Sequence, residues 1–195
     1  MLVNILKLSQ IYMIDAGSAY AIHHLELQQM SPARRIELSR MFSVHDWVED
    51  AFRRLMEVDL ANLIEDDECR LGYKVYRIIA KTKEYIDKQR KSAAQVAPPV
   101  TFLESYECMD HKTCKEVWKD GWWKKVSKRL LHPTQPISLR EVADYVFGLD
   151  FPGMTSVCKA EMVDFIRNND GFRIEDVIIR QGIDAVVAYH KTLEM

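Results

Sequence analysis

Glycine and proline are scarce in this chain of 195 residues, with 7 and 6 residues respectively. Leu, Ala, Glu, Lys and Arg are abundant instead, and this composition favours helices over sheets. No convincing run of alternating apolar residues predicts a strand, and no repeat of fixed period predicts a solenoid. We therefore expect an all-α fold, a bundle of short antiparallel helices in two parts.

A strong charge of one sign is also missing, because the formal net charge is −2 at pH 7. A general nucleic-acid binder needs a strong positive field, so nucleic acid is an unfavoured partner. The apolar first segment, MLVNILKLSQIYMI, carries Asn4, Lys7 and Gln10 and is too short to span a membrane. No small-residue cleavage site follows a clean apolar run. We expect a buried helix there and no membrane partner.

Only 4 cysteines occur, without a secretory signal, which is typical of reduced thiols in the cytoplasm or nucleus. The motifs of several enzyme classes are absent, since there is no Gly-rich phosphate loop and no nucleophile elbow. A cysteine nucleophile with His111 as its base would lack any recognisable turn or oxyanion arrangement. We therefore expect a protein that is not an enzyme, with no catalytic or cofactor-binding residues.

Apolar residues recur at helical spacing in the first half of the chain. Ser31 and Pro32 predict a helix start, and Ser43 with Asp46 predicts another. The second of these helices carries an apolar face, from which we expect Trp47 and Phe52 to be core anchors. That face consists of Trp47, Val48, Ala51, Phe52 and Leu55.

The character of the chain changes after residue 88. The segment KQRKSAAQVAPPV passes from charged to small residues and ends at Pro98-Pro99, which cannot continue a helix. We interpret residues 90–100 as a linker between a helical region at 1–89 and a C-terminal helical domain at 101–195. The alternative is a long loop inside one compact domain.

Four helices are predicted beyond this segment, one of which carries Cys158, Met162 and Phe165 on one face up to Asn168. The first covers about Lys112–Leu131, with an apolar residue at every fourth position, and Ser138 with Glu141 caps the next. The last runs from Ile174 to Leu193. The four apolar residues of the first helix are Trp118, Trp122, Val126 and Leu130.

The sharpest local pattern is Cys108-x-x-His111-x-x-Cys114, with Cys158 far downstream. Three thiolates and an imidazole suit tetrahedral zinc, which makes these four residues a weak candidate set. However, Cys114 and Cys158 lie on apolar helix faces, where cysteine is an ordinary buried residue. We expect them to be neutral thiols near Trp118, with no metal, and zinc is the alternative.

Three further patterns have ordinary explanations. His23 and His24 point about 100° apart on a helix and cannot easily share one ion. The acidic run Asp66-Asp67-Glu68 is typical of a helix N-terminus rather than a calcium loop. Basic residues beside Trp122-Trp123 could form a nucleic-acid patch, but an amphipathic helix with tryptophan inward and lysine outward explains them.

One longer pattern carries a resemblance. It runs from Ser31-Pro32 through Asp46-Trp47 and the acidic run at 66–68 to Arg70-Leu71-Gly72. This order resembles the helical region that follows the BTB/POZ domain in fungal, basidiomycete-type BTB proteins. Weaker similarity extends upstream and downstream over most of the chain. Because Met1 falls inside what resembles the helix after the BTB fold, we expect that fold to be absent from this sequence, either by truncation of a longer chain or by loss in this relative.

The resemblance implies binding rather than chemistry. BTB domains commonly drive dimerisation and, in many proteins, recruit a cullin-type ubiquitin ligase, but neither property transfers without that fold. We expect a non-enzymatic scaffold or adaptor module that binds unidentified protein partners. An apolar patch at Leu2, Ile5, Leu6 and Leu8 would allow self-association through the N-terminal helix. The alternative is a small metal-stabilised or nucleic-acid-binding regulatory protein.

Overall fold

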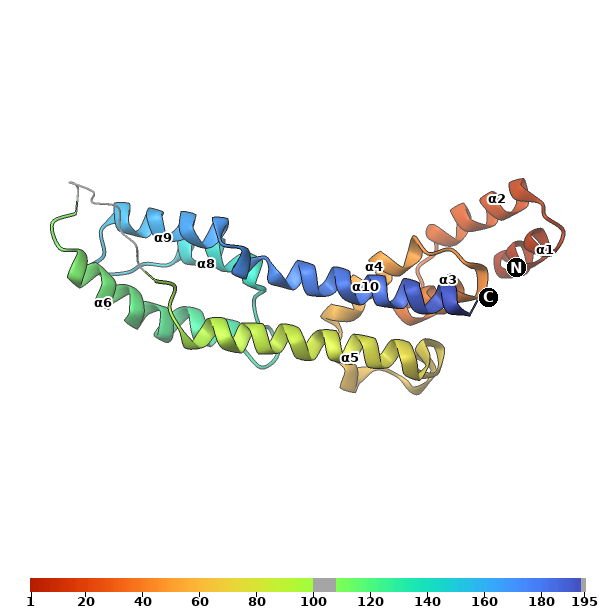
Figure 1. Ribbon diagram of the computed structural model, residues 1–195. Coiled ribbons are helices and arrows are strands. Elements are labelled where there is room, and N and C mark those ends of the chain that lie inside the picture. The colour runs from red at the N-terminus through yellow and green to blue at the C-terminus, as the bar shows by residue number, and fades with distance from the viewer. Residues whose placement is uncertain (100–107, 194–195) are drawn as a thin grey trace. The chain divides into compact units, whose positions relative to one another are not determined.

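The computed structural model describes residues 1–99 and 108–193, and within these ranges it contains helices and no strands. The all-α prediction is confirmed (Figure 1). None of the helices in the described ranges is both long and apolar enough to cross a membrane. The α-helices are α1 (Leu2–Ile11), α2 (Asp15–Glu26), α3 (Pro32–Phe42), α4 (Trp47–Glu57), α5 (Glu65–Gln95), α6 (His111–Gly121), α7 (Lys128–Leu130), α8 (Val142–Gly148), α9 (Ser156–Asn168) and α10 (Ile174–Thr192).

The chain divides into two compact units that differ from the predicted domains. One unit combines Met1–Lys81 with Gln181–Met195, and the other is Thr82–Arg180. The predicted linker is wrong as far as Gln95, because α5 continues to that residue. Lys, Arg, Ala and Gln are strong helix formers, and nothing before Pro98 interrupts the helix. Ala94 is fully buried, so this stretch belongs to the core of the second unit.

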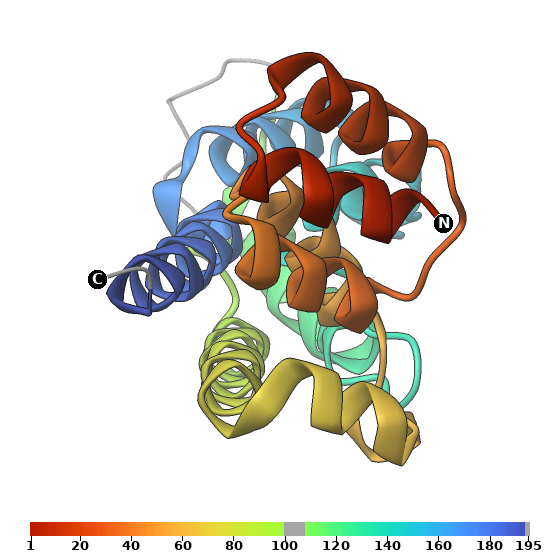
Figure 2. The ribbon, with the colours of Figure 1, turned by 90° about the vertical axis from the view of Figure 1, so that its right-hand side faces the viewer.

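In the first unit, α1 and α2 lie side by side (Figures 1 and 2). Gly17 permits this contact, because a Cβ at that position would lie 2.3 Å from the Ser9 hydroxyl oxygen. The core beneath the pair includes residues from four helices. These buried residues are Leu6, Ala21, Leu25, Leu38, Phe42 and Trp47.

The N-terminal caps of α3 and α4 differ. Ser31 caps α3 as predicted, since its Oγ accepts the Arg34 N–H at 3.2 Å. The predicted cap at Ser43 is wrong. Ser43 instead ends α3 with φ 55°, and Asp46 precedes α4 without a side-chain cap. Trp47 and Phe52 are buried as expected, and the Trp47 Nε1–H donates to Glu26 Oε1 at 3.0 Å.

In the second unit, the apolar residues that recur every fourth position share one buried core. An α-helix has 3.6 residues per turn, so a spacing of four would rotate steadily around it. A π-helical segment at Trp122–Ser127 has a wider turn and compensates for this drift. The core also contains Phe151, whose ring lies against Gly121, where a Cβ would be 2.5 Å from Cε1.

The second unit also contains the predicted capping box. Glu141 Oε2 accepts hydrogen bonds from the backbone N–H and the Oγ–H of Ser138, both at 2.9 Å. A short 3-10 helix, Leu139–Glu141, then leads into α8. Ser138 and Glu141 therefore begin this helical segment at the residue that the sequence predicted.

Candidate functional site

The four residues of the cysteine and histidine pattern converge within the second unit. The Sγ atoms of Cys108 and Cys114 lie 3.7 Å apart, and Cys158 Sγ lies 3.6 Å from His111 Nδ1. One ligand atom from each of Cys108, His111 and Cys158 lies within 4.8 Å of the others. The three cysteines are buried, His111 is half-buried, and Met154 packs against the group. We call these four residues the Cys3His cluster.

Two helix starts position the cluster. Asp110 caps α6 by accepting the Thr113 N–H at 3.0 Å, so His111 and Cys114 lie one turn apart on that helix. Thr155 caps α9, its Oγ1 accepting the Cys158 N–H at 3.4 Å. The same hydroxyl oxygen lies 3.9 Å from Cys114 Sγ, beside the sulfurs.

The electrostatics of the cysteines differ. Burial, together with contacts from the thiols of Cys108 and Cys114, raises the pKa of the Cys158 thiol to about 12. At Cys108 burial acts in the same direction, but hydrogen bonds from Thr155, from the Asp110 backbone and with the thiols of Cys158 and Cys114 together lower the pKa. None of the four cysteines forms a disulfide.

The prediction placed the thiols near Trp118. The three cysteines cluster outside the core cluster that contains Trp118, and Met154 packs against both clusters. Helical spacing placed Cys114 and Cys158 inside the fold correctly. It gave no sign that Cys108 and His111 would meet them, because Cys158 comes from a helix far along the chain.

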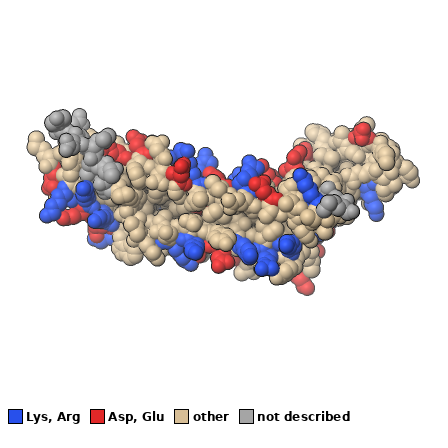
Figure 3. All heavy atoms as spheres, in the orientation of Figure 1, with Lys and Arg blue, Asp and Glu red and all other residues tan. Residues whose placement is uncertain are grey.

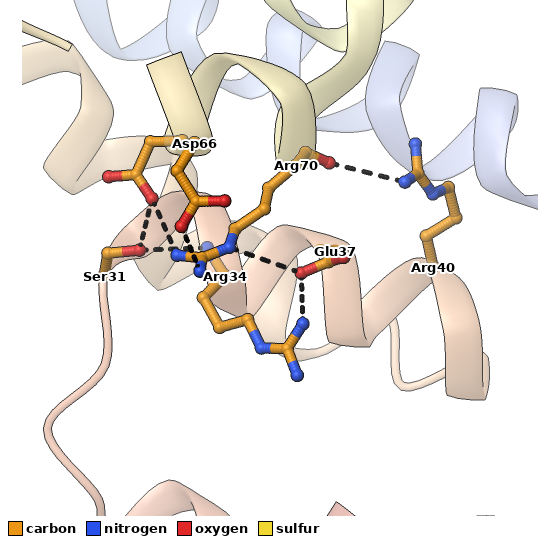
Figure 4. Close-up of polar contacts among 7 residues, drawn as sticks. Ser31, Arg34, Glu37, Arg40, Asp66 and Arg70 are labelled. Carbon is orange, nitrogen blue, oxygen red and sulfur yellow. Dashed lines mark hydrogen bonds and ion pairs between the residues drawn. The ribbon is translucent and has the colours of Figure 1, made fainter. Parts of the chain in front are cut away.

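The motif residues of the first unit meet in a polar network between α3 and the start of α5 (Figure 4). Ser31 Oγ donates to Asp67 Oδ1 at 2.8 Å, and Arg70 pairs with Asp67 at 3.1 Å and also with Asp66. Glu37 pairs with Arg34 and lies 3.8 Å from Arg70 Nε. The acidic run therefore lies in the first turn of a helix, as predicted, and binds arginines.

A backbone break lies beside this network. Gly72 has φ 70° and ψ 158° inside α5, a conformation that only glycine adopts readily. The break accompanies a hydrogen bond from the Arg40 guanidinium to the Arg70 carbonyl at 3.3 Å (Figure 4). The pattern Arg70-Leu71-Gly72 thus has a structural role that explains these residue types without a ligand.

The basic segment beside Trp122 and Trp123 was predicted to turn its tryptophans inward and its lysines outward, and the structure agrees with this only in part. Trp122 is buried, but Trp123 is 61% exposed. The Lys124 ammonium pairs with Asp120 at 2.8 Å, and Lys125 donates to the Asp150 carbonyl. Asp120 offsets one positive charge of this segment, and lysine and arginine are mixed with aspartate and glutamate over the visible face of the molecule (Figure 3).

The turn between α1 and α2 exposes an apolar surface. Met13 is 89% exposed, and few charged side chains are visible on this part of the chain (Figure 3). The predicted patch is wrong at Leu6, which is fully buried, whereas Leu8 is exposed. We define the α1–α2 apolar surface by the exposed large side chains at the end of α1 and in the turn: Leu8, Ile11, Tyr12, Met13 and Ile14.

The remaining candidates are a histidine pair and a groove. His23 is exposed and His24 half-buried on α2, with ring centroids 5.4 Å apart, and neither belongs to a metal-binding group. The groove lies in the second unit, and sequence reasoning missed it. Arginine–aspartate pairs line it, including Arg167 with Asp144 at 3.0 Å, so its charges largely neutralise one another.

Comparison of the chain with protein-family models, with curated proteins and with solved structures finds no match. The resemblance to fungal BTB proteins therefore stays a prediction. Function has to be argued from the residues themselves.

Proposed function

We propose that this chain is a non-enzymatic helical interaction module, a scaffold or adaptor, that associates with a second copy of itself through the α1–α2 apolar surface. The observation that carries the proposal is the exposed apolar turn at Ile11–Ile14. Exposed apolar groups gathered in one place are typical of association sites in proteins. The predicted resemblance supports the same class of function.

The backbone at Met13 supports a functional role for this turn. Met13 has φ 55°, and the N–H groups of Met13 and Ile14 bond to the carbonyls of Gln10 and Ser9. This is the helix ending at which glycine is normally preferred, because other residues are strained there. A large apolar side chain at a strained and exposed position is a cost to stability, which function would explain.

A second copy of the chain is the partner that best fits this surface. A surface that meets its own copy in a twofold dimer places identical groups close together, so like charges on it would repel. The segment Leu8–Ile14 contains no charged residue. It can therefore face itself without that penalty.

Sedimentation velocity over a range of protein concentrations tests the proposal. Met13→Gly should keep the fold, since glycine relieves the strain, and should weaken self-association about tenfold or more. Ser43→Gly is the matched control, because Ser43 also has φ 55° at a helix end but carries no apolar side chain. A wild-type protein that stays monomeric at high concentration would contradict the proposal, as would an equal effect of both variants.

A further inference from the structure

We propose that Cys108, His111, Cys114 and Cys158 bind one zinc ion, with all four coordination positions supplied by the protein. The proposal rests on the convergence of donor atoms from Cys108, His111 and Cys158, with the Cys114 Sγ 3.7 Å from the Cys108 Sγ, and it does not depend on the self-association proposed above. Helical spacing alone favours neutral thiols in the core, and the geometry of the cluster leads to the opposite inference.

Two separations between donor atoms match edges of a zinc tetrahedron. With Zn–S near 2.3 Å and Zn–N near 2.0–2.1 Å, two sulfurs lie about 3.8 Å apart, and a sulfur lies about 3.5 Å from a nitrogen. The corresponding distances here are 3.7 Å between Cys108 and Cys114, and 3.6 Å between Cys158 and His111. The Cys158 thiol also contacts those of Cys108 and Cys114.

The donor set selects the ion by its chemistry. Three thiolates and an imidazole are soft or borderline ligands, which favour zinc over magnesium or calcium. Four protein ligands leave no open position, so the site would be structural rather than catalytic. This agrees with a non-enzymatic role but does not require one.

The surroundings suit the charge of such a site. Zn²⁺ with three thiolates carries one net negative charge, and the cluster lies at the N-termini of α6 and α9, where helix dipoles favour negative charge. The Thr155 hydroxyl, 3.9 Å from Cys114 Sγ, is the kind of outer group that orients a ligating sulfur. The two helix N-termini would stabilise the charge of a buried thiolate site, and the hydroxyl would help to orient a sulfur.

The ion would join two helix starts that the sequence keeps far apart. Cys108, His111 and Cys114 lie at the start of α6, whereas Cys158 lies in the first turn of α9. A metal that binds both fixes them together, and its binding free energy becomes folding free energy. The cysteines lie outside the apolar core cluster of the second unit. Zinc would therefore stabilise a part of this unit that the core cluster does not cover.

Metal content and cobalt spectroscopy of the full chain test the proposal. The purified wild-type protein should hold about one equivalent of zinc, and chelation should lower its melting temperature by about 10 °C or more. Co²⁺ added to the chelated protein should produce thiolate charge-transfer and tetrahedral ligand-field bands. Cys158→Ser should lose at least about nine-tenths of the zinc, whereas the control Cys69→Ser, at an exposed site on α5, should retain it.

A conservative pair of variants separates metal binding from folding. His111→Cys should still bind the metal, with shifted cobalt bands, whereas His111→Ala should bind it at least about tenfold more weakly. Both remove the same half-buried imidazole, so a purely structural role would affect them alike. A folded wild-type protein without zinc that gives no cobalt bands would overturn the proposal, as would a melting temperature that zinc leaves unchanged.

Discussion

The Arg90 guanidinium forms a bidentate ion pair with the Glu175 carboxylate, with N–O distances of 2.7 and 2.9 Å. The partners lie on α5 and α10, within the second unit. Glu175 is buried, and the same carboxylate also accepts the Leu139 N–H at 3.0 Å. One acidic side chain therefore connects α5, α10 and the start of the α8 segment.

Breaking this pair should destabilise the protein strongly. Arg90→Met leaves a buried carboxylate without its cation, and we expect a loss of about 3 kcal/mol in the free energy of unfolding, measured by urea denaturation. Arg140→Met is the control, because Arg140 and Asp176 are exposed and their closest atoms are 3.7 Å apart. The control should cost less than about 1 kcal/mol. Equal losses in the two variants would contradict a special role for Glu175.

Gly72→Ala should also destabilise the protein. A Cβ at φ 70° and ψ 158° is strained, so we expect a cost of about 1–3 kcal/mol by thermal and chemical denaturation. Gly148→Ala is the matched control, since nothing lies within 4 Å of the added methyl group. It should be neutral or stabilising by up to about 1 kcal/mol. If Gly72→Ala were harmless, the break in α5 would be absent in solution.

Trp47→Ala should cost roughly 3–5 kcal/mol, because the ring is buried in the core of the first unit. Trp123→Ala removes the same side chain from an exposed position and should change stability by less than about 0.5 kcal/mol. Both variants can be compared by their urea midpoints. A Trp47 variant with an unchanged midpoint would show that this residue is exposed.

Local patterns predicted the features that depend on near neighbours in sequence. The apolar stripe around Trp47 and the caps at Ser31 and Ser138 were recognisable because periodicity and capping act over a few residues. The cap assigned to Ser43 was wrong because the same residue types also end helices, in the left-handed conformation.

Features that join distant segments could not be predicted in this way. The end of α10 belongs to the unit formed by the N-terminal helices. No local pattern predicts a unit that is built from two separate stretches of the chain. In the same way, Cys108 and Cys114 are close in sequence, but only the packing of α9 against its neighbours brings Cys158 to them. The sequence pattern therefore identifies the four candidate ligands, but only the fold shows that Cys158 lies beside the other three.

The capping box makes a pH-dependent contribution. Hydrogen bonds from the backbone and hydroxyl of Ser138 lower the pKa of Glu141 below its ordinary value. A lowered pKa stabilises the fold above the ordinary pKa of the group, and the contribution disappears as the pH falls through the lowered value. Glu141→Gln should therefore cost up to about 1 kcal/mol at pH 7 and almost nothing at an acidic pH below the lowered pKa.

Urea denaturation of both proteins at each pH measures this difference. Glu116→Gln, an equal charge change at an exposed site on α6, is the control. It should stay within about 0.5 kcal/mol of the wild type throughout. A Glu141 effect that is the same at both pH values would show that the charge of the carboxylate contributes nothing.

Thiol reactivity provides the last prediction, for folded protein treated with a chelator. Burial raises the pKa of Cys158 to about 12, whereas Cys69 is exposed. Because only the thiolate reacts, alkylation at pH 8 should modify Cys69 at least about a hundredfold faster than Cys158.

The raised pKa of Cys158 also affects the stability of the fold. The protonated thiol stabilises the metal-free fold below its ordinary pKa of 9.0, and this contribution is lost as the pH rises towards 12.

Peptide mapping by mass spectrometry at successive times measures the two rates. Cys69→Ser should remove the fast reaction and leave the slow one unchanged, which identifies the exposed thiol. Zinc, if bound as proposed, should protect the cluster cysteines even at pH values where their thiols would otherwise ionise, because the metal occupies the sulfur lone pairs. Equal rates at Cys69 and Cys158 in the folded protein would show that the cluster is open to solvent, and the buried site described above would then be wrong.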